Sequence, residues 1–153
     1  RYNWDSQIIE PRFVLLHTIA HLMINRLIFE SGYGSASLRE RLYVSSTSGM
    51  EMAGILVYTA AGDSEGTMGG LVGLASPESL GRIFVNAVEE AQWCSADPVC
   101  SEVARSGGQG PDSLNLAACH NCALLPETSC EHFNKFLDRM LLVDPAISII
   151  SSP

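Results

Sequence analysis

The sequence predicts an α+β fold that is mainly helical, with a small β-sheet and a four-cysteine zinc-binding subdomain. Three observations lead to this prediction. Apolar residues recur at spacings of three and four over long stretches, β-forming residues gather in one short stretch, and all five cysteines fall within the 37 residues from Cys94 to Cys130. The 153 residues match the length of one domain, so we expect a single domain over residues 1–153.

The longest helix is expected from about Glu10 to Ser31, with Pro11 in its first turn and Gly32 after its end. Its apolar stripe consists of Phe13, Leu16, Ala20, Met23, Ile24, Leu27 and Ile28. The stretch Ser37-Leu38-Arg39-Glu40 has the spacing of a capping box, which predicts a short second helix through Leu42.

The β-sheet is expected from two stretches. Residues Met52 to Ala61 contain the continuous run Ile55-Leu56-Val57-Tyr58, which predicts a strand buried on both faces. The polar, glycine-rich segment Gly62 to Thr67 follows as a solvated turn or a partner-contact loop, and Gly69 to Ala75 is read as a second short strand. A phosphate-binding P-loop requires a lysine that this segment lacks, which argues against ATP binding by that route.

The C-terminal half contains two further helix starts. Ser76-Pro77-Glu78 predicts a helix to about Trp93. Its inward residues are expected to be Leu80, Phe84, Val88 and Ala91. Residues Ser106 to Ser113 form an expected flexible insertion, and the capping box at Thr128-Ser129-Cys130-Glu131 predicts a last helix to about Val143.

The net charge and the amino-acid composition argue against several classes of function. The 17 acidic and 9 basic residues give a net charge of −8, which argues against a stand-alone nucleic-acid-binding surface. Charged residues make up only 17% of the chain, which favours an apolar contact with a neighbour. No apolar run reaches the roughly 18 residues of a membrane span. The start at Arg1, without Met or a secretory pattern, predicts a cytoplasmic piece of a larger protein.

The cysteines predict a metal site. Cys119-His120-Asn121-Cys122 is a C-x2-C knuckle whose two thiolates can bind one ion, and Cys94 and Cys100 can supply the other half of a tetrahedral site. The ion would join the helix that ends near Cys94 to the segment before the last helix. We expect this zinc subdomain at about residues 93–143, and zinc is favoured because no iron-specific spacing occurs.

Other interpretations of the cysteines remain open. Cys130, expected in the first turn of the last helix, where the dipole favours a thiolate, can replace one of the four. The five can also be free buried thiols, or Cys119 and Cys122 a redox dithiol. A zinc deaminase is excluded, since residue 118 is Ala and no H-x-E occurs.

Other polar residues favour packing over chemistry. His17 and His21 share one helix face at zinc-ligand spacing, but without the glutamate of a zinc protease we expect packed, hydrogen-bonded histidines. The scattered arginines read as ordinary surface residues; they are Arg39, Arg41, Arg82 and Arg105. No catalytic arrangement is recognisable, so we predict no catalytic residues, no small-molecule substrate and no enzyme activity.

Several motifs resemble the MrfA-type zinc-binding (MZB) domain over about residues 12–143. They are Phe13–His21, Ala36–Tyr43, Ala53–Thr59, Asp63–Leu71, Trp93–Cys100, Ala118–Cys122 and Leu125–Glu131. The resemblance is closest to the C-terminal part of the B component of the DISARM anti-phage defence system. In the repair helicases of this family the first two cysteines lie much closer together than in this chain.

The resemblance implies a non-catalytic accessory domain. Four cysteines of the cluster would hold Zn²⁺, here Cys94, Cys100, Cys119 and Cys122. The domain would support DNA binding or translocation by a helicase-like partner of the same defence system, with DNA contacted through the complex. Two alternatives of other classes remain: a thiol- or metal-dependent enzyme using Cys119 and Cys122, and a protein–protein scaffold without DNA contact.

Overall fold

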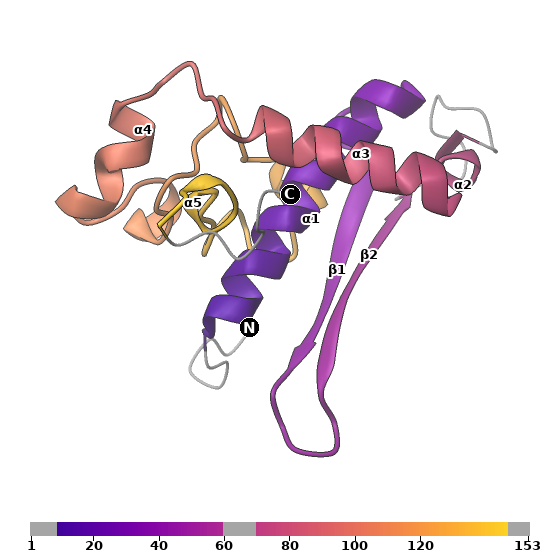
Figure 1. Cartoon of the computed structure of the whole chain (residues 1–153), viewed down its shortest axis with the longest axis horizontal. Coiled ribbons are helices and arrows are strands. Elements are labelled where there is room, and N and C mark those ends of the chain that lie inside the picture. Colours follow the sequence, from indigo (N-terminus) through magenta and orange to yellow (C-terminus); the bar gives the residue numbers. More distant parts are fainter. Residues whose placement is uncertain (1–8, 60–69, 147–153) are drawn as a thin grey trace.

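The longest helix, α1 (Pro11–Ser31), runs through the middle of the molecule, and the β-hairpin and the next long helix pack against it (Figure 1). The computed structural model describes residues 9–59 and 70–146. Pro11 lies at the start of α1, and Gly32 ends it in the left-handed region at φ 72°, donating its N–H to the Ile28 carbonyl. The predicted helix and both of its end signals are therefore confirmed.

The position of α1 is that of a core helix. Its buried face includes Ala20, Ile24 and Leu27, and also the polar residues His17 and His21. By length and composition alone α1 could cross a membrane, but half of its most apolar stretch is buried inside the fold. That stretch packs against the hairpin and α3.

The sheet is a two-stranded antiparallel hairpin of β1 (Leu38–Ser45) and β2 (Met52–Thr59), paired from Leu38 with Thr59 to Ser45 with Met52. The predicted helix at Ser37–Leu42 is wrong. Alternate residues of β1 face α1, so Leu38 and Glu40 are buried while Arg39 and Arg41 are exposed. Cross-strand pairing and this burial override the local capping-box signal.

The strand predicted at Met52–Ala61 is confirmed as β2, but its burial on both faces is wrong. Leu56 and Tyr58 are about two-fifths exposed because α1 covers only one face of the hairpin. The predicted strand at Gly69–Ala75 is also wrong, since Gly70–Gly73 form the single helical turn α2. The polar segment at Gly62–Thr67 lies outside the described residues.

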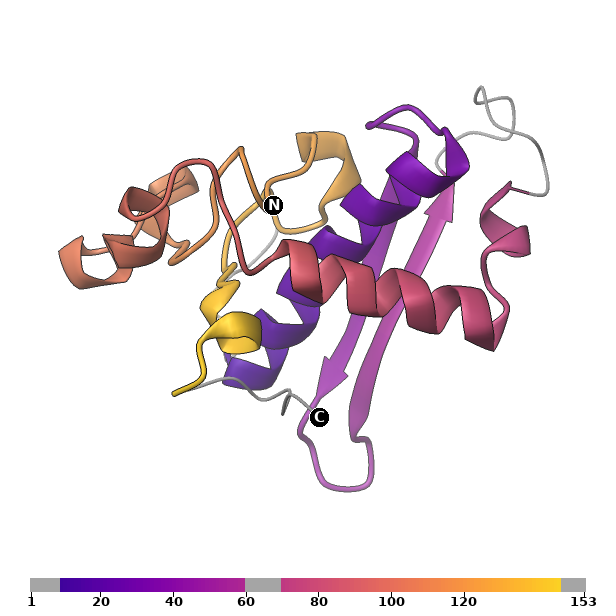
Figure 2. The same ribbon diagram turned by 45° about the horizontal axis from the view of Figure 1, so that its top comes forward.

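Helix α3 (Pro77–Glu90) crosses α1 (Figure 2). Ser76 caps it, accepting a hydrogen bond from the Ser79 N–H at 3.3 Å, as the sequence predicts. Of the predicted inward residues, Ala91 is buried and Phe84 and Val88 are partly buried, whereas the other buried residues of this stretch are Ile83 and Ala87. Leu80 is exposed instead.

The C-terminal region is mostly irregular, with two short helices, α4 (Val99–Glu102) and α5 (Met140–Val143). The predicted long helix from Thr128 is wrong. Phe133, Asn134 and Phe136 have φ between 54° and 63°, which a right-handed helix excludes. The Asn134 side chain accepts from the Leu125 N–H and donates to the Leu125 carbonyl, so a long-range contact replaces helical bonding here.

The expected insertion at Ser106–Ser113 forms hydrogen-bonded turns. Gln109 and Asn115 exchange backbone hydrogen bonds of 2.7 and 3.0 Å. Two glycines make this possible: a Cβ on Gly108 would lie 2.3 Å from the Ser113 carbonyl, and one on Gly110 would lie 2.5 Å from Asn115 Nδ2.

Candidate metal centre

Four cysteines from three segments converge at one end of the molecule. Cys94 follows the end of α3, Cys100 lies in α4, and Cys119 and Cys122 lie in a turn closed by the Cys122 N–H on the Cys119 carbonyl at 3.1 Å. The four Sγ atoms all lie within 4.8 Å of one another. Cys94 and Cys100 are buried, and the other two are partly exposed.

The separations of these sulfurs have the size expected around a tetrahedral ion. Cys94 and Cys119 Sγ lie 3.6 Å apart, and Cys122 Sγ lies 3.8 Å from both Cys100 and Cys119. Four Zn–S bonds of about 2.3 Å at tetrahedral angles place neighbouring sulfurs about 3.8 Å apart. A disulfide needs about 2.05 Å, and all five cysteines are free.

Hydrogen-bond donors point at the sulfurs. The Ala96 N–H donates to Cys94 Sγ at 3.4 Å, the Cys119 N–H to Cys122 Sγ at 3.3 Å, and Gln109 Nε2 to Cys100 Sγ at 3.5 Å. Such donors stabilise thiolate over thiol. The surroundings therefore suit sulfurs that carry negative charge.

The thiols differ in pKa without a bound cation. Burial raises the pKa of Cys100, and burial together with the neighbouring sulfurs raises that of Cys122. Burial also acts to raise the pKa of Cys119, but hydrogen bonds from the Asn121 N–H and from adjacent thiols lower it overall. A divalent cation is needed to hold all four as thiolates.

A partly buried ion pair supports the loop between Cys94 and Cys100. Asp97 accepts hydrogen bonds from the Cys94 N–H at 3.0 Å and the Ser101 N–H at 3.1 Å. Both of its carboxylate oxygens also bind Arg139, whose side chain is only 1% exposed and donates to the Ala91 carbonyl at 2.8 Å. Sequence reasoning missed both residues, because neither carries a local pattern that indicates this contact.

The ion pair shifts both groups toward their charged forms. Burial acts to raise the pKa of Asp97, but Arg139 and the two backbone N–H donors hold it below its usual range. Burial acts to lower the pKa of Arg139, but Asp97 and the nearby cysteines Cys122 and Cys100 raise it. Arg139 thus places a positive charge near the four sulfurs.

The C-terminal segment is joined to the knuckle by backbone pairing. The Leu116 N–H donates to the Leu137 carbonyl, and the Arg139 N–H donates to that of Ala117, at 3.0 and 3.3 Å. The side chain of Asn115, which is fully buried, adds two hydrogen bonds to this pairing. It donates to the Asn134 carbonyl and accepts from the Leu137 N–H. These bonds hold Arg139 where it can reach Asp97.

Cys130 lies apart from these four cysteines. It groups instead with His17, His21 and Glu40, all buried. The expected helix dipole at Cys130 is absent, because no helix begins there, and burial and Glu40 raise the pKa of this thiol. Burial lowers the pKa of His17 to about 4, so this imidazole is neutral at pH 7. Sequence reasoning missed Glu40 because it placed this residue in a helix.

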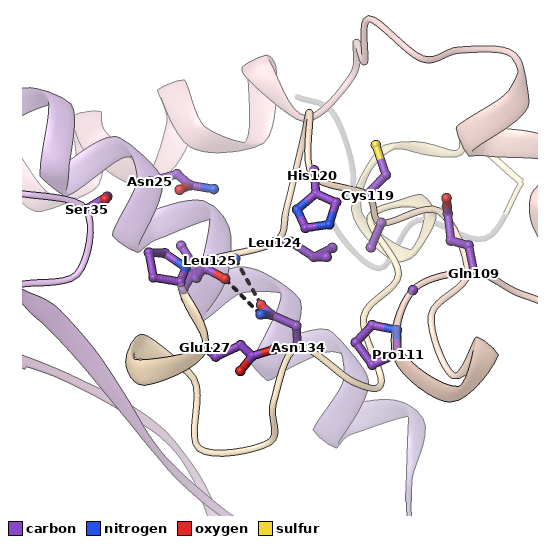
Figure 3. Close-up of a pocket in the computed structure, with 13 residues that line it drawn as sticks. Asn25, Ser35, Gln109, Pro111, Cys119, His120, Leu124, Leu125, Glu127 and Asn134 are labelled. Carbon is purple, nitrogen blue, oxygen red and sulfur yellow. Dashed lines mark hydrogen bonds between the residues drawn. The ribbon is translucent and has the colours of Figure 1, made fainter.

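A pocket opens beside the knuckle (Figure 3). Cys119 and His120 line it on one side, and Leu125 and Glu127 line it on the other. Figure 3 also shows the paired hydrogen bonds between Asn134 and Leu125, both of which line the pocket. The pocket therefore lies next to the cysteine turn that contains Cys119.

Comparison with known proteins agrees with this geometry. Residues 19–123 match the MrfA Zn-binding domain, and this stretch contains Cys94, Cys100, Cys119 and Cys122. The chain is 46% identical over 131 residues to the DISARM protein DrmB of Bacillus paralicheniformis, and the aligned part covers 86% of this chain. The same part covers 22% of that protein, so the chain spans about a fifth of the length of this relative. The match extends over more than half of the 153 residues, and the chain therefore belongs to the MrfA Zn-binding domain family.

Proposed function

We propose that Cys94, Cys100, Cys119 and Cys122 hold one structural Zn²⁺ and that the chain is a non-catalytic accessory domain. The observation that carries this proposal is the convergence of four Sγ atoms within 4.8 Å, at separations close to the edge of a zinc–sulfur tetrahedron. Zinc bound by four thiolates has no open position for a substrate, which supports a structural role over a catalytic one.

The bound ion would stabilise a zinc subdomain at about residues 93–143. This region has only short helices connected by loops. A bound metal ion could hold these loops together. In model peptides, structural zinc contributes on the order of 10–16 kcal/mol to folding. Zinc here would connect α4 and the C-terminal end of α3 to the turn that contains Cys119 and Cys122.

We propose that the domain acts in the cytoplasm as part of a DISARM-type anti-phage protein. Its identity of 46% to DrmB supports this assignment. It would support DNA binding or translocation by a helicase-like partner, contacting DNA through the complex, because a net charge of −8 opposes DNA binding by the domain alone. Trp93 and Val99 are more than 70% exposed beside the cysteines and offer an apolar surface to a protein partner.

Metal analysis of the purified protein tests the zinc assignment. X-ray absorption at the zinc edge should show an ion bound by four sulfurs, and this ion should be absent from the Cys119→Ser variant. A metal-free protein with a reducible bond between Cys119 and Cys122 would overturn the assignment and favour a thiol-dependent enzyme.

The DNA role needs a separate experiment on the complex. DNA binding by the parent protein with its helicase-like partner should be compared with and without this domain over a range of salt concentrations. We expect weaker binding or slower translocation when the domain is removed. If both are unchanged at every salt concentration, the domain is a protein–protein scaffold and the DNA role is wrong.

A further inference from the structure

A second group of metal-ligating side chains lies in the core, outside the four-cysteine site. It consists of His17 and His21 on α1, Glu40 on β1, and Cys130. One nitrogen, oxygen or sulfur atom from each lies within 4.8 Å of the others, and no residue of the group is more than 5% exposed. The group joins three segments that are distant in the sequence.

This group buries polar atoms that lack hydrogen bonds. Among the described residues, both carboxylate oxygens of Glu40 and the Nε2 atom of His21 have no hydrogen-bond partner, although Glu40 Oε1 lies 3.0 Å from His17 Nε2 and 3.5 Å from His21 Nε2. His17 Nδ1 is likewise unsatisfied. A buried carboxylate without compensation is strongly destabilising, so a cation is expected close to Glu40.

The tautomer of His21 is that of a metal ligand. Its Nδ1 atom lies 2.8 Å from the Ala123 carbonyl, which can only accept a hydrogen bond. Nδ1 therefore carries a proton, which leaves Nε2 as the nitrogen that can bind a metal ion. Nε2 lies 3.5 Å from Glu40 Oε1, and a metal ion between them would bind both. Histidine ligands of metals commonly donate their other N–H to a backbone carbonyl in this way.

Cys130 is arranged as a thiolate ligand. Its Sγ accepts hydrogen bonds from the His132 N–H at 3.3 Å and the Asn134 N–H at 3.2 Å, and it lies 3.2 Å from His17 Nε2. The two residues that follow His132, Phe133 and Asn134, have positive φ, so the chain turns tightly beside the sulfur. The irregular turn that replaces the expected helix thus provides two hydrogen-bond donors to the sulfur of Cys130.

The distances and charges fit a zinc ion. Around tetrahedral zinc, two nitrogen or oxygen ligands lie about 3.3 Å apart, and nitrogen lies about 3.6 Å from sulfur. The observed separations of 3.0, 3.5 and 3.2 Å are within about 0.4 Å of these values. Two neutral imidazoles, one carboxylate and one thiolate carry a charge of −2, so a divalent cation makes the buried group neutral.

We propose that His17, His21, Glu40 and Cys130 bind a second structural zinc ion, which fastens the β1–β2 hairpin and the Cys130 turn to α1. This site shares no ligand with the four-cysteine site. His17 and Cys130 also lie outside the stretch 19–123 that matches the family, so the family assignment does not imply it. With four protein ligands and no exposed edge, the site is closed to substrates.

Zinc-edge X-ray absorption of the wild-type protein, purified without added metal, tests the proposal without any variant. We expect two zinc ions per chain and, across both, about five sulfur and three nitrogen or oxygen ligands. One zinc per chain with sulfur ligands only would overturn the second site and leave the first intact. One zinc with two nitrogens, one oxygen and one sulfur would support the second site and overturn the proposed four-cysteine site.

The Glu40→Gln variant tests whether Glu40 binds a metal ion or only forms hydrogen bonds. Glutamine keeps the size of the side chain and can donate a hydrogen bond to His21 Nε2, so a metal-free cluster should tolerate it. If Glu40 binds zinc, the variant should lose one zinc per chain and melt at a lower temperature. Retention of two zinc ions with an unchanged melting temperature contradicts Glu40 as a ligand.

Two further variants serve as controls. Glu51→Gln removes an exposed carboxylate and should keep both zinc ions. His120→Gln removes an exposed histidine beside the first site and should also leave the zinc content unchanged. If Glu51→Gln loses as much zinc as Glu40→Gln, the loss does not come from a missing ligand and the proposal fails.

Discussion

The guanidinium of Arg139 binds both carboxylate oxygens of Asp97 across 42 positions of the sequence. This contact ties the start of α5 to the loop between Cys94 and Cys100. Asp97 also accepts the Cys94 N–H, so one carboxylate orients a cysteine and neutralises a buried arginine. The position of the first cysteine pair thus depends on a residue near the end of the chain.

We expect Asp97→Asn to lower the free energy of unfolding of the zinc-loaded protein by about 3 kcal/mol, because it leaves the Arg139 charge buried without its partner. Urea unfolding measures this change. The matched control is Glu90→Gln, which breaks an ion pair with Arg26 in which Glu90 is 60% exposed and should cost less than about 1 kcal/mol. Equal losses in the two variants would show that the Asp97–Arg139 pair has no special role.

Cys119→Ser is expected to remove the zinc ion of the four-cysteine site and to unfold the region around it. The hydroxyl of serine is a poor zinc ligand, and the ion would join loops from three segments of the chain. Inductively coupled plasma mass spectrometry should show a loss of one zinc per chain, and near-ultraviolet circular dichroism should show lost tertiary structure.

The control for this variant is His120→Ala, which changes the exposed neighbour of Cys119 in the same turn. It should keep the zinc content and the spectrum of the wild type. A folded Cys119→Ser protein with its full zinc content would rule out Cys119 as a ligand.

The helices α1 and α3 could be predicted from local patterns because both have clear end signals and apolar residues at helical spacing. Pro11, Gly32 and Ser76 each act on the backbone next to them, and the structure confirms all three. Glu40 shows where local reasoning fails. The residues Ser37–Glu40 fit a helix cap, yet the burial of Glu40 beside two histidines of α1 requires a strand, and this contact is visible only in three dimensions.

The same limit applies to the candidate site. The C-x2-C spacing and the cysteine cluster were sufficient to predict a metal site, and the structure brings the sulfurs of Cys94, Cys100, Cys119 and Cys122 together. The residues that support the cysteine site could not be predicted from the sequence. No sequence pattern connects Arg139 with Asp97. Asn134 lies in the segment predicted to be helical, but its side chain forms hydrogen bonds with Leu125 instead.

Zinc affinity at the four-cysteine site should fall steeply as the pH is lowered. Cys100 and Cys122 have raised pKa values in the absence of a cation, so they are protonated at neutral pH and must lose protons when zinc binds. Each proton released makes the affinity about tenfold lower per pH unit of acidification. These two protons alone make binding at least about a hundredfold weaker at pH 6.5 than at pH 7.5.

Competition with a chromophoric chelator at the two pH values, corrected for the chelator's own protonation, measures this dependence. The Cys130→Ser variant isolates the four-cysteine site, because Cys130 belongs to the other cluster. An affinity that does not change with pH would mean that the thiols are already ionised before zinc binds, which contradicts their raised pKa values.

Asn115→Ala should destabilise the C-terminal region although Asn115 touches none of the cysteine sulfurs. Its side chain donates to the Asn134 carbonyl at 2.7 Å and accepts from the Leu137 N–H at 3.0 Å, and it is fully buried. Alanine would leave both backbone groups buried without partners, at about 1–3 kcal/mol each. We expect a total loss of about 3 kcal/mol in urea unfolding.

The exposed Asn121 provides the comparison for this variant, because Asn121→Ala removes the same amide from the protein surface and should change the stability by less than about 0.5 kcal/mol. Hydrogen exchange at the Leu137 and Arg139 amides distinguishes a local from a global effect. Faster exchange at both amides in Asn115→Ala, with α1 still protected, would show that Asn115 holds the strand-like pairing that carries Arg139 to Asp97. Unchanged exchange at these amides would mean that the pairing persists without the Asn115 side chain.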